Sequence, residues 1–362
     1  MHDIIILRLV TLLLLVAPSL AMAQVTPNRE DAMNFPSKHA WNLFLLVNHP
    51  AKDPKLGRGQ PDLSKSIGTP GTTSVWETWR LTGTEVCLKD GDEPPQDFND
   101  NSLAGSPVTG KVPEPPKHVL LAKLAAAGSP FVNQRMVLQP LFDFDGGVFR
   151  GEGAFGESRM NKATYDFVWT NKIYSLKGLR AFAAKKAPLS FPVDSMEVKA
   201  AWIELTPELL QGGAEKRYYT ADYDGKKYGL SSLHIITKDV PNWFWCTFHH
   251  KESPNTGVET PDTFGQPSQL KGTVWENYKL GGTQTEFVTT IGQPTLLSDP
   301  YIEKGFEKSS CISCHARASI DDTGRGLSSK AVVGAPNPAD FTKDGKPIFQ
   351  TDFLFSLPFR AH

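Results

Sequence analysis

The sequence predicts an α+β protein, with a predominantly antiparallel β-sheet body and flanking helices. Residues 196–203 alternate between apolar and polar side chains, which is typical of a strand with one buried face. Asp224-Gly225 lies between aromatic flanks and is a strong signal for a two-residue hairpin turn. Apolar side chains recur at helical spacing in residues 34–48 and 161–174. Together these patterns favour strands in the middle of the chain and helices beside them.

The first expected element is the helix at 34–48. Ser37 is a plausible N-cap, and Trp41 and Phe44 belong to an apolar stripe that faces the core. His39 is expected at the surface. The other expected features before residue 150 are Pro- and Gly-rich loops at 50–74 and 90–116, a short helix at 119–127 and a strand at 136–144.

Two further strands are expected at 230–237 and 242–250. Because side chains alternate along a strand, Cys246, Phe248 and His250 should share one face, and Trp245 and His249 the other. Later in the chain, Asp299-Pro300 predicts the start of a helix that runs to about Ser309. A final aromatic strand is expected at 352–355.

The clearest functional motif in the sequence is Cys311-Ile312-Ser313-Cys314-His315. Two cysteines three positions apart, followed at once by histidine, form the pattern of covalent haem c attachment. Cys311 and Cys314 would each bind one vinyl group of a single haem, and His315 would be the proximal iron ligand. The alternatives are a thioredoxin-like redox pair, half of a zinc site, or a chance match in a loop.

The beginning of the chain predicts export. Residues 9–16 form an apolar run after Arg8, and the small-residue triplet Ala21-Met22-Ala23 follows, so residues 1–23 are expected to be a cleaved signal peptide. The apolar run is shorter than the roughly 20 residues that cross a membrane, and we expect no membrane span after cleavage. Export to the periplasm of a Gram-negative bacterium agrees with haem c attachment. The formal net charge of −1 gives no basic excess to suggest nucleic acid.

The mature chain is expected to divide into a β-rich body at 24–290, with an N-terminal helix and long Pro/Gly loops, and a haem c attachment region at 291–362. No methionine follows His315, whereas a helical class I cytochrome c supplies a methionine ligand from downstream of its motif. The sequence therefore predicts a C-terminal attachment helix or loop on a sheet-rich body. A distal ligand would come from upstream, where the candidates are the histidines and Met33, Met136, Met160 and Met196. His250 is the first candidate, with a hydrogen-bonded strand-end histidine as the competing interpretation.

Cys87 and Cys246 lie outside the motif. In an oxidising compartment they could form one disulfide. Alternatively, Cys246 is a small buried apolar side chain within the aromatic run 243–248.

The Cys-x-x-Cys-His motif after a β-rich body, with the closing Asp-Phe-x-Phe of residues 352–355, resembles the group formed by cytochrome P460 and the β-sheet cytochromes c′. This resemblance implies a sheet that encloses a five-coordinate haem and, in some members, a strand lysine cross-linked to the porphyrin. Lys199, beside Glu197, is the candidate lysine, and a solvent-facing strand lysine is the alternative. The whole chain also resembles large periplasmic mono-haem cytochromes c of Gram-negative bacteria.

Three functions agree with these features. The first is electron transfer by one covalent haem c to or from a redox partner protein. The second is a haem enzyme that oxidises a small nitrogen compound or peroxide, with a general base such as Glu197 or a histidine. The third is a gas-binding haem module, with a small-molecule ligand as its partner. Base rates favour the first.

Overall fold

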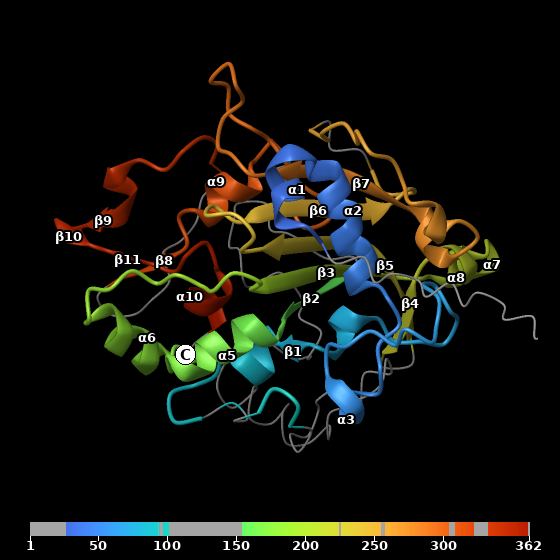
Figure 1. Cartoon of the computed structure of the whole chain (residues 1–362), viewed down its shortest axis with the longest axis horizontal. Helices are drawn as coiled ribbons and strands as arrows, with labels where there is room; N and C mark the ends of the chain where they lie inside the picture. The colour runs from blue at the N-terminus through green and yellow to red at the C-terminus, as the bar shows by residue number, and fades with distance from the viewer. Residues whose placement is uncertain are drawn as a thin grey trace, which may run out of the picture.

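The computed structural model describes residues 27–92, 94, 97–100, 154–223, 226–254, 258–303, 308–321 and 332–360 (Figure 1). The predicted signal peptide at 1–23, helix at 119–127 and strand at 136–144 lie outside the described residues. So do the two turn residues Asp224 and Gly225.

A seven-stranded antiparallel sheet forms the centre of the described structure, with strand order β1-β2-β3-β5-β6-β7 and with β4 paired to β5. Its strands are β1 (Arg80–Leu81), β2 (Ala154–Met160), β3 (Met196–Glu204), β4 (Thr220–Tyr223), β5 (Lys226–Thr237), β6 (Phe244–His250) and β7 (Tyr278–Gln284). The predicted α+β class with a mostly antiparallel sheet is confirmed. β5 is buried along most of its length, because strands pair with it on both sides.

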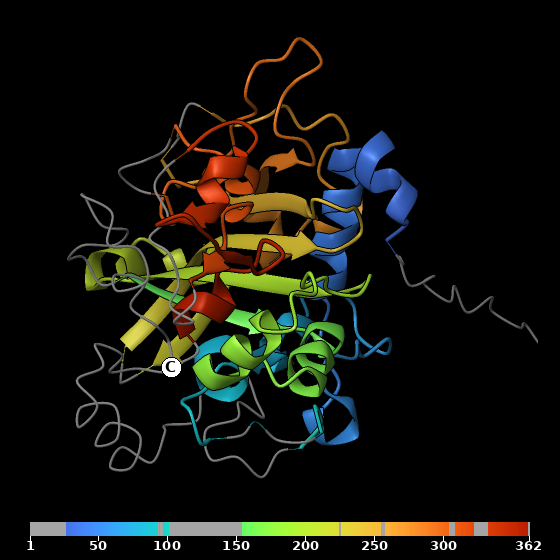
Figure 2. The same cartoon turned by 90° about the vertical axis from the view of Figure 1, so that its left-hand side faces the viewer.

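One face of the sheet packs on the N-terminal helix α2 (Pro36–Val47), and α1 (Arg29–Asn34) packs against α2. The Phe44 ring of α2 lies 4.5 Å from the Phe248 ring of β6, and the Trp41 ring lies 4.9 Å from it. Figure 2 shows these helices on one side of the sheet and the C-terminal segments on the other. We call these sides the helix face and the motif face.

The predicted helix at 34–48 is largely confirmed as α2, but two details of the prediction were wrong. The N-cap position is Phe35, with Pro36 in the first turn, and Ser37 lies inside the helix. His39 is fully buried, because its Nε2 is 2.9 Å from the Asp239 carboxylate in the loop after β5. That partner is 200 residues away, so local periodicity did not indicate it.

The hairpin prediction is confirmed by the pairing on both sides of the turn. Tyr223 at the end of β4 pairs with Lys226 at the start of β5. The predicted alternation in β6 is confirmed as well, because Phe248 contacts α2 while Trp245 contacts His315 on the motif face.

The other helices are short. They are α3 (Pro54–Gly57), α5 (Lys162–Thr170), α6 (Leu176–Ala183), α7 (Pro207–Gln211), α8 (Ala214–Arg217), α9 (Cys311–His315) and α10 (Ser356–Arg360). The predicted helix at 161–174 is α5, and the Asn161 side chain caps it by accepting the Thr164 N–H. Single 3-10 or π turns occur at Val75–Thr78, Thr82–Val86, Ser268–Leu270, Val274–Asn277 and Pro338–Phe341. Two small antiparallel pairs join β8 (Ser319–Ile320) to β11 (Phe349–Gln350) and β9 (Thr342–Lys343) to β10 (Lys346–Pro347).

Two C-terminal predictions differ from the structure. Asp299 caps a turn by accepting the N–H groups of Tyr301 and Ile302, and the described residues after it form no α-helix before α9. The expected strand at 352–355 is a turn, because Asp352 and Phe353 have φ values of 47° and 70°. Within the described part of the chain, no helix is long and apolar enough to cross a membrane.

Candidate functional site

The Cys-x-x-Cys-His motif forms the one-turn helix α9 on the motif face of the sheet. Ser310 is its N-cap, with Oγ accepting the Ser313 N–H at 3.3 Å. The Gln284 side chain at the end of β7 accepts the Ile312 N–H and donates to Ser310 Oγ, at 3.2 and 3.1 Å. A helix this short does not persist alone, so the edge strand holds the motif in place.

The His315 imidazole has a defined orientation. Its Nδ1 lies 2.9 Å from the backbone carbonyl oxygen of Phe353. A carbonyl only accepts, so Nδ1 carries the proton and Nε2 presents a lone pair. The ring packs against Trp245 and Phe355, with centroid distances of 4.6 and 5.1 Å. Burial lowers the pKa of His315 to about 3, against the opposing effect of the hydrogen bond to Phe353, so the imidazole is neutral at pH 7.

The Phe353 carbonyl is presented by an unusual turn. Asp352 and Phe353 are consecutive residues in the left-handed region, which costs about 1–2 kcal/mol for each L-residue. The turn is tethered by the Asp352 carboxylate, which accepts the Phe191 N–H at 2.7 Å and pairs with Lys238 Nζ at 2.6 Å. Non-glycine residues in this conformation persist where their surroundings determine it.

The two thiols differ in environment. Cys311 is buried, and its Sγ donates to the Leu297 carbonyl at 3.2 Å. Burial, with a contribution from Glu303, raises the pKa of Cys311 well above its usual range, so this side chain is a thiol at neutral pH. Cys314 lies on the same helical turn and is half-buried.

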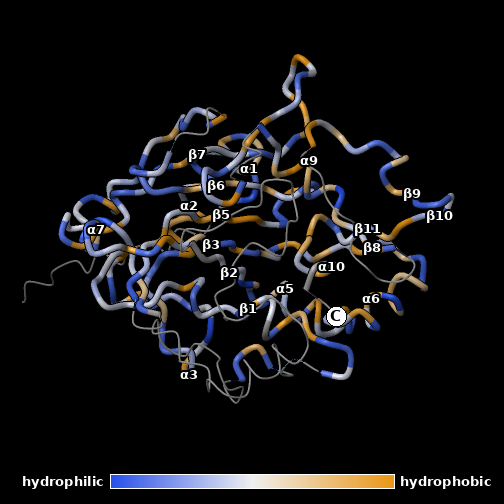
Figure 3. The backbone as a smooth tube through the Cα atoms, turned by 180° about the vertical axis from the view of Figure 1, so that it is seen from behind, coloured by the Kyte–Doolittle hydropathy of each residue, from blue (hydrophilic) through white to orange (hydrophobic). Residues whose placement is uncertain are grey.

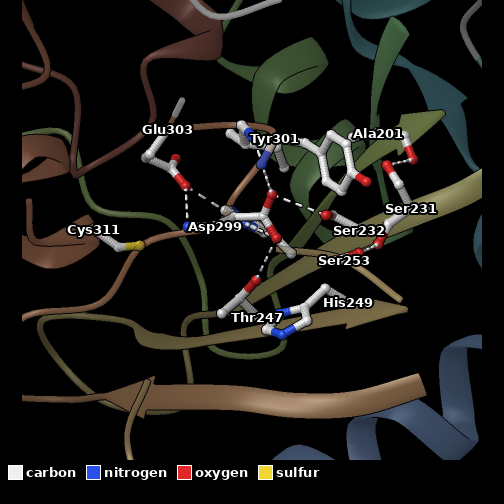
Figure 4. A network of polar contacts seen from close by, with 12 residues as sticks. Ala201, Ser231, Ser232, Thr247, His249, Ser253, Asp299, Tyr301, Glu303 and Cys311 are labelled. Atoms are coloured by element: carbon white, nitrogen blue, oxygen red, sulfur yellow. Dashed lines mark hydrogen bonds and ion pairs between the residues drawn. The ribbon is translucent and has the colours of Figure 1, made fainter. Parts of the chain in front are cut away.

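A polar cluster lies beside Cys311 on the motif face (Figure 4). His234 Nε2 is 3.8 Å from an oxygen of Asp299 and 3.8 Å from an oxygen of Glu303. The fully buried Asp299 accepts from Ser232 Oγ at 2.8 Å, and the Asp299 N–H donates to Glu303. Lys199 sits directly opposite His234 in the β3–β5 register, so both side chains leave the same face. We call His234, Asp299, Glu303 and Lys199 the motif-face cluster.

The charges of the cluster influence one another. Burial raises the pKa of the Glu303 carboxyl, while His234 and Lys199 oppose that shift. For Asp299, burial also acts to raise the pKa, but the neighbouring His234 and the hydrogen bond from the Ile302 N–H outweigh it, and the net shift is downward. The two neighbouring carboxyls are therefore shifted in opposite directions, with the pKa of Asp299 lowered and that of Glu303 raised.

The donor set fits haem c. Two thiols on one helical turn precede a neutral imidazole whose Nδ1–H is held by a backbone carbonyl, as second-shell groups hold metal-ligating histidines. Cys311, Cys314 and His315 would hold the group. Among the described residues, no cluster of three or more His, Cys, Asp or Glu is arranged to bind a bare metal ion.

His250, the first distal candidate, lies on the helix face and not with the motif. Its ring stacks on Tyr218 at 3.6 Å. Its Nε2 donates to the Arg217 carbonyl and its Nδ1 accepts the Glu252 N–H, each at 3.2 Å. Both ring nitrogens of His250 are engaged in hydrogen bonds to the main chain. Because His250 and His315 lie on opposite faces of the sheet, the structure does not bring them together.

The other candidate residues have mixed placements. Lys199 is half-buried on the motif face, and Glu197 is buried and accepts a hydrogen bond from Ser356 at the start of α10. Cys87 and Cys246 are both buried, and no disulfide joins them. Cys246 Sγ donates to the Ile235 carbonyl at 3.4 Å, as a small core side chain would.

Several site residues were missed by sequence reasoning. The Gln284 side chain and the Phe353 carbonyl act through hydrogen bonds that depend on tertiary packing, and sequence carries no signal for them. Asp299 was recognised only as a helix cap, although Asp299-Pro300 did mark a turn beside the motif. Comparison with family models, with characterised proteins and with solved structures finds no match for this chain.

Proposed function

We propose that the chain is an exported c-type cytochrome that binds one haem through Cys311 and Cys314, with His315 as the proximal iron ligand. The observation that carries the proposal is the hydrogen bond from His315 Nδ1 to the Phe353 carbonyl. It leaves Nε2 as the ligating nitrogen, on a helical turn that also carries both thiols. The predicted signal peptide at 1–23 supports a periplasmic location.

Electron transfer is the activity that we propose for this site. When bound, the haem supplies a one-electron iron couple. The protein would hold the proximal imidazole neutral and fixed, and would exclude water with Trp245 and Phe355. A redox partner protein would supply or accept the electron.

A haem enzyme is the second candidate, and the motif-face cluster favours it. Lys199, His234 and Glu303 are titratable groups beside Cys311, and Glu303 has a raised pKa. Such groups could move a proton to or from a small nitrogen compound or peroxide. The resemblance to cytochrome P460 adds Lys199 as a candidate cross-linking residue. A gas-binding module would use the same face with an open iron position.

Haem attachment is tested by expressing the chain with its leader in a bacterium that matures c-type cytochromes. The purified protein should keep haem colour on a denaturing gel, and the double variant Cys311→Ala/Cys314→Ala should lose it. The matched control is Cys87→Ala/Cys246→Ala, which should keep it. Equal loss in both double variants, or no haem in the parent protein, would contradict the proposal.

Oxidised and reduced optical spectra then separate the two functions. A carrier should show low-spin ferrous bands that carbon monoxide leaves unchanged. High-spin ferrous bands that shift with carbon monoxide would exclude the simple carrier and favour the enzyme or the gas-binding module. His250→Ala should leave the spectrum unchanged, since His250 lies on the helix face.

A further inference from the structure

A large groove opens beside the motif, at the end of the molecule where Figures 1 and 3 show α6, β8 and β11. Its volume is about 1060 Å³, at the upper end of the range for ligand pockets. Aromatic and aliphatic side chains form much of the lining, including Phe287, Phe349 and Phe353. Ala316, the residue after His315, also lines it. The groove therefore adjoins the end of the motif helix.

The segment 167–193, which supplies part of the groove lining, is rich in basic side chains, and Asp90 from an earlier segment accepts its Lys177 N–H at 2.7 Å. Between Asp166 and Asp194 the chain has five cationic side chains and no acidic one: Lys172, Lys177, Arg180, Lys185 and Lys186. All five are exposed, and Arg180 and Lys186 line the groove itself. We call these five residues the basic rim. It is a local feature, because the chain as a whole has a formal net charge of −1.

The acidic residues of the groove are engaged in ion pairs. Asp321 pairs with Lys343 at 2.9 Å, and Asp352 pairs with Lys238 at 2.6 Å. Each of these carboxylates is therefore balanced by a lysine, and the exposed Lys186 adds positive charge to the same groove. The groove should attract anionic groups.

The floor of the groove is connected to the proximal imidazole. Phe353 lines the groove, and its carbonyl accepts the His315 Nδ1–H at 2.9 Å. The Trp245 ring lies 4.6 Å from the His315 ring and 6.1 Å from the Phe353 ring. One hydrogen bond and one aromatic contact thus separate a groove-lining residue from the predicted iron ligand.

We propose that the groove and its basic rim are the docking surface of an acidic one-electron carrier protein. One electron passes from the reduced carrier to the ferric haem, the carrier is oxidised, and no proton or bond is exchanged. The concave shape fits a protruding part of a protein, whereas a flat bilayer would not enter it, and the rim supplies charge complementarity for steering. This inference rests on the proposed function and names the partner of the same site.

The test uses charge reversal on the haem-loaded protein. Lys177→Glu/Lys186→Glu reverses two rim charges, and Lys55→Glu/Lys271→Glu makes the same change in net charge at exposed lysines outside the basic rim. The ferrous protein is oxidised by ferricyanide, a trianion, and in parallel by tris(phenanthroline)cobalt(III), a trication. At low salt the rim variant should react with ferricyanide about 10-fold more slowly than the control, with the difference fading at high salt. The cobalt reagent should show the opposite trend.

A second readout is independent of haem chemistry. The redox-inert paramagnetic trianion hexacyanochromate(III) should broaden backbone amide signals of residues 172–186 in the parent protein and in the control, but much less in the rim variant. Equal ferricyanide rates for the rim variant and control, or broadening centred elsewhere, would overturn the docking surface. A parent protein without covalent haem would overturn the proposed function as well, so the two failures are distinguishable.

Discussion

The tether that holds the Asp352–Phe353 turn can be tested by removing its carboxylate. In Asp352→Ala, the Phe191 N–H loses its acceptor, which costs about 1–3 kcal/mol when the group is buried. Lys238 loses its partner in a pair whose side chains are 11% and 9% exposed. Breaking a buried pair costs about 3–5 kcal/mol, and the low end applies here because Lys238 keeps the Pro241 carbonyl at 2.9 Å.

These losses overlap, so we expect Asp352→Ala to lower the free energy of unfolding by about 3–5 kcal/mol. Asp352→Asn keeps an oxygen for the Phe191 N–H and tolerates the left-handed conformation, so the loss should be about 1–2 kcal/mol. Denaturant unfolding of the two variants measures both values.

Asp344→Ala is the matched control, because Asp344 is exposed and has φ of 51°. This variant should lose only about 1 kcal/mol of unfolding free energy, because Ala adopts the left-handed conformation less readily than Asp does. If Asp352→Ala lowers the free energy of unfolding by no more than Asp344→Ala does, the Asp352 contacts do not stabilise the turn and the prediction is wrong.

Three further outcomes follow from buried groups. Burial lowers the pKa of His250, so below about pH 6.5 the unfolded chain binds a proton that the folded chain does not. The free energy of unfolding therefore decreases as the pH is lowered through this range. His250→Gln should flatten the stability curve between pH 7 and pH 5 by up to about 2 kcal/mol; an unchanged slope would contradict this. Gly281→Ala places a Cβ 2.7 Å from His249 Cε1 and should cost about 1–3 kcal/mol in thermal unfolding, with partial recovery when His249→Ala is added; a neutral Gly281→Ala would count against the tight packing. Thiol titration of the denatured haem-loaded protein should find Cys87 and Cys246 as two reactive groups, whereas a disulfide would leave none without reductant.

Local patterns predicted the elements that depend on local physics. The Asp224-Gly225 turn signal led to the β4–β5 pairing, and helical spacing led to α2 and α5. The alternation in β6 separated Trp245 from Phe248 onto different faces.

The predictions that were wrong depend on contacts between residues that lie far apart in the sequence. His39 was expected at the surface because its Asp239 partner is 200 residues away. Residues 352–355 contain alternating aromatics, but the Phe191 and Lys238 contacts hold Asp352 in a turn. The support of His315 is a main-chain carbonyl, which every residue possesses, so no side-chain pattern could indicate Phe353.

The Asp352 tether also bears on the order of folding. It joins positions 161 residues apart at Phe191 and 114 residues apart at Lys238, whereas the β4–β5 hairpin joins near neighbours. Closing such long loops is entropically costly and comes after local pairing. If the cysteines receive haem as proposed, we therefore expect them to be accessible to the haem-attaching enzymes while the His315 ring is still free to rotate. Orientation of that ring would be among the last events, completed only when the two distant ends of the tether meet.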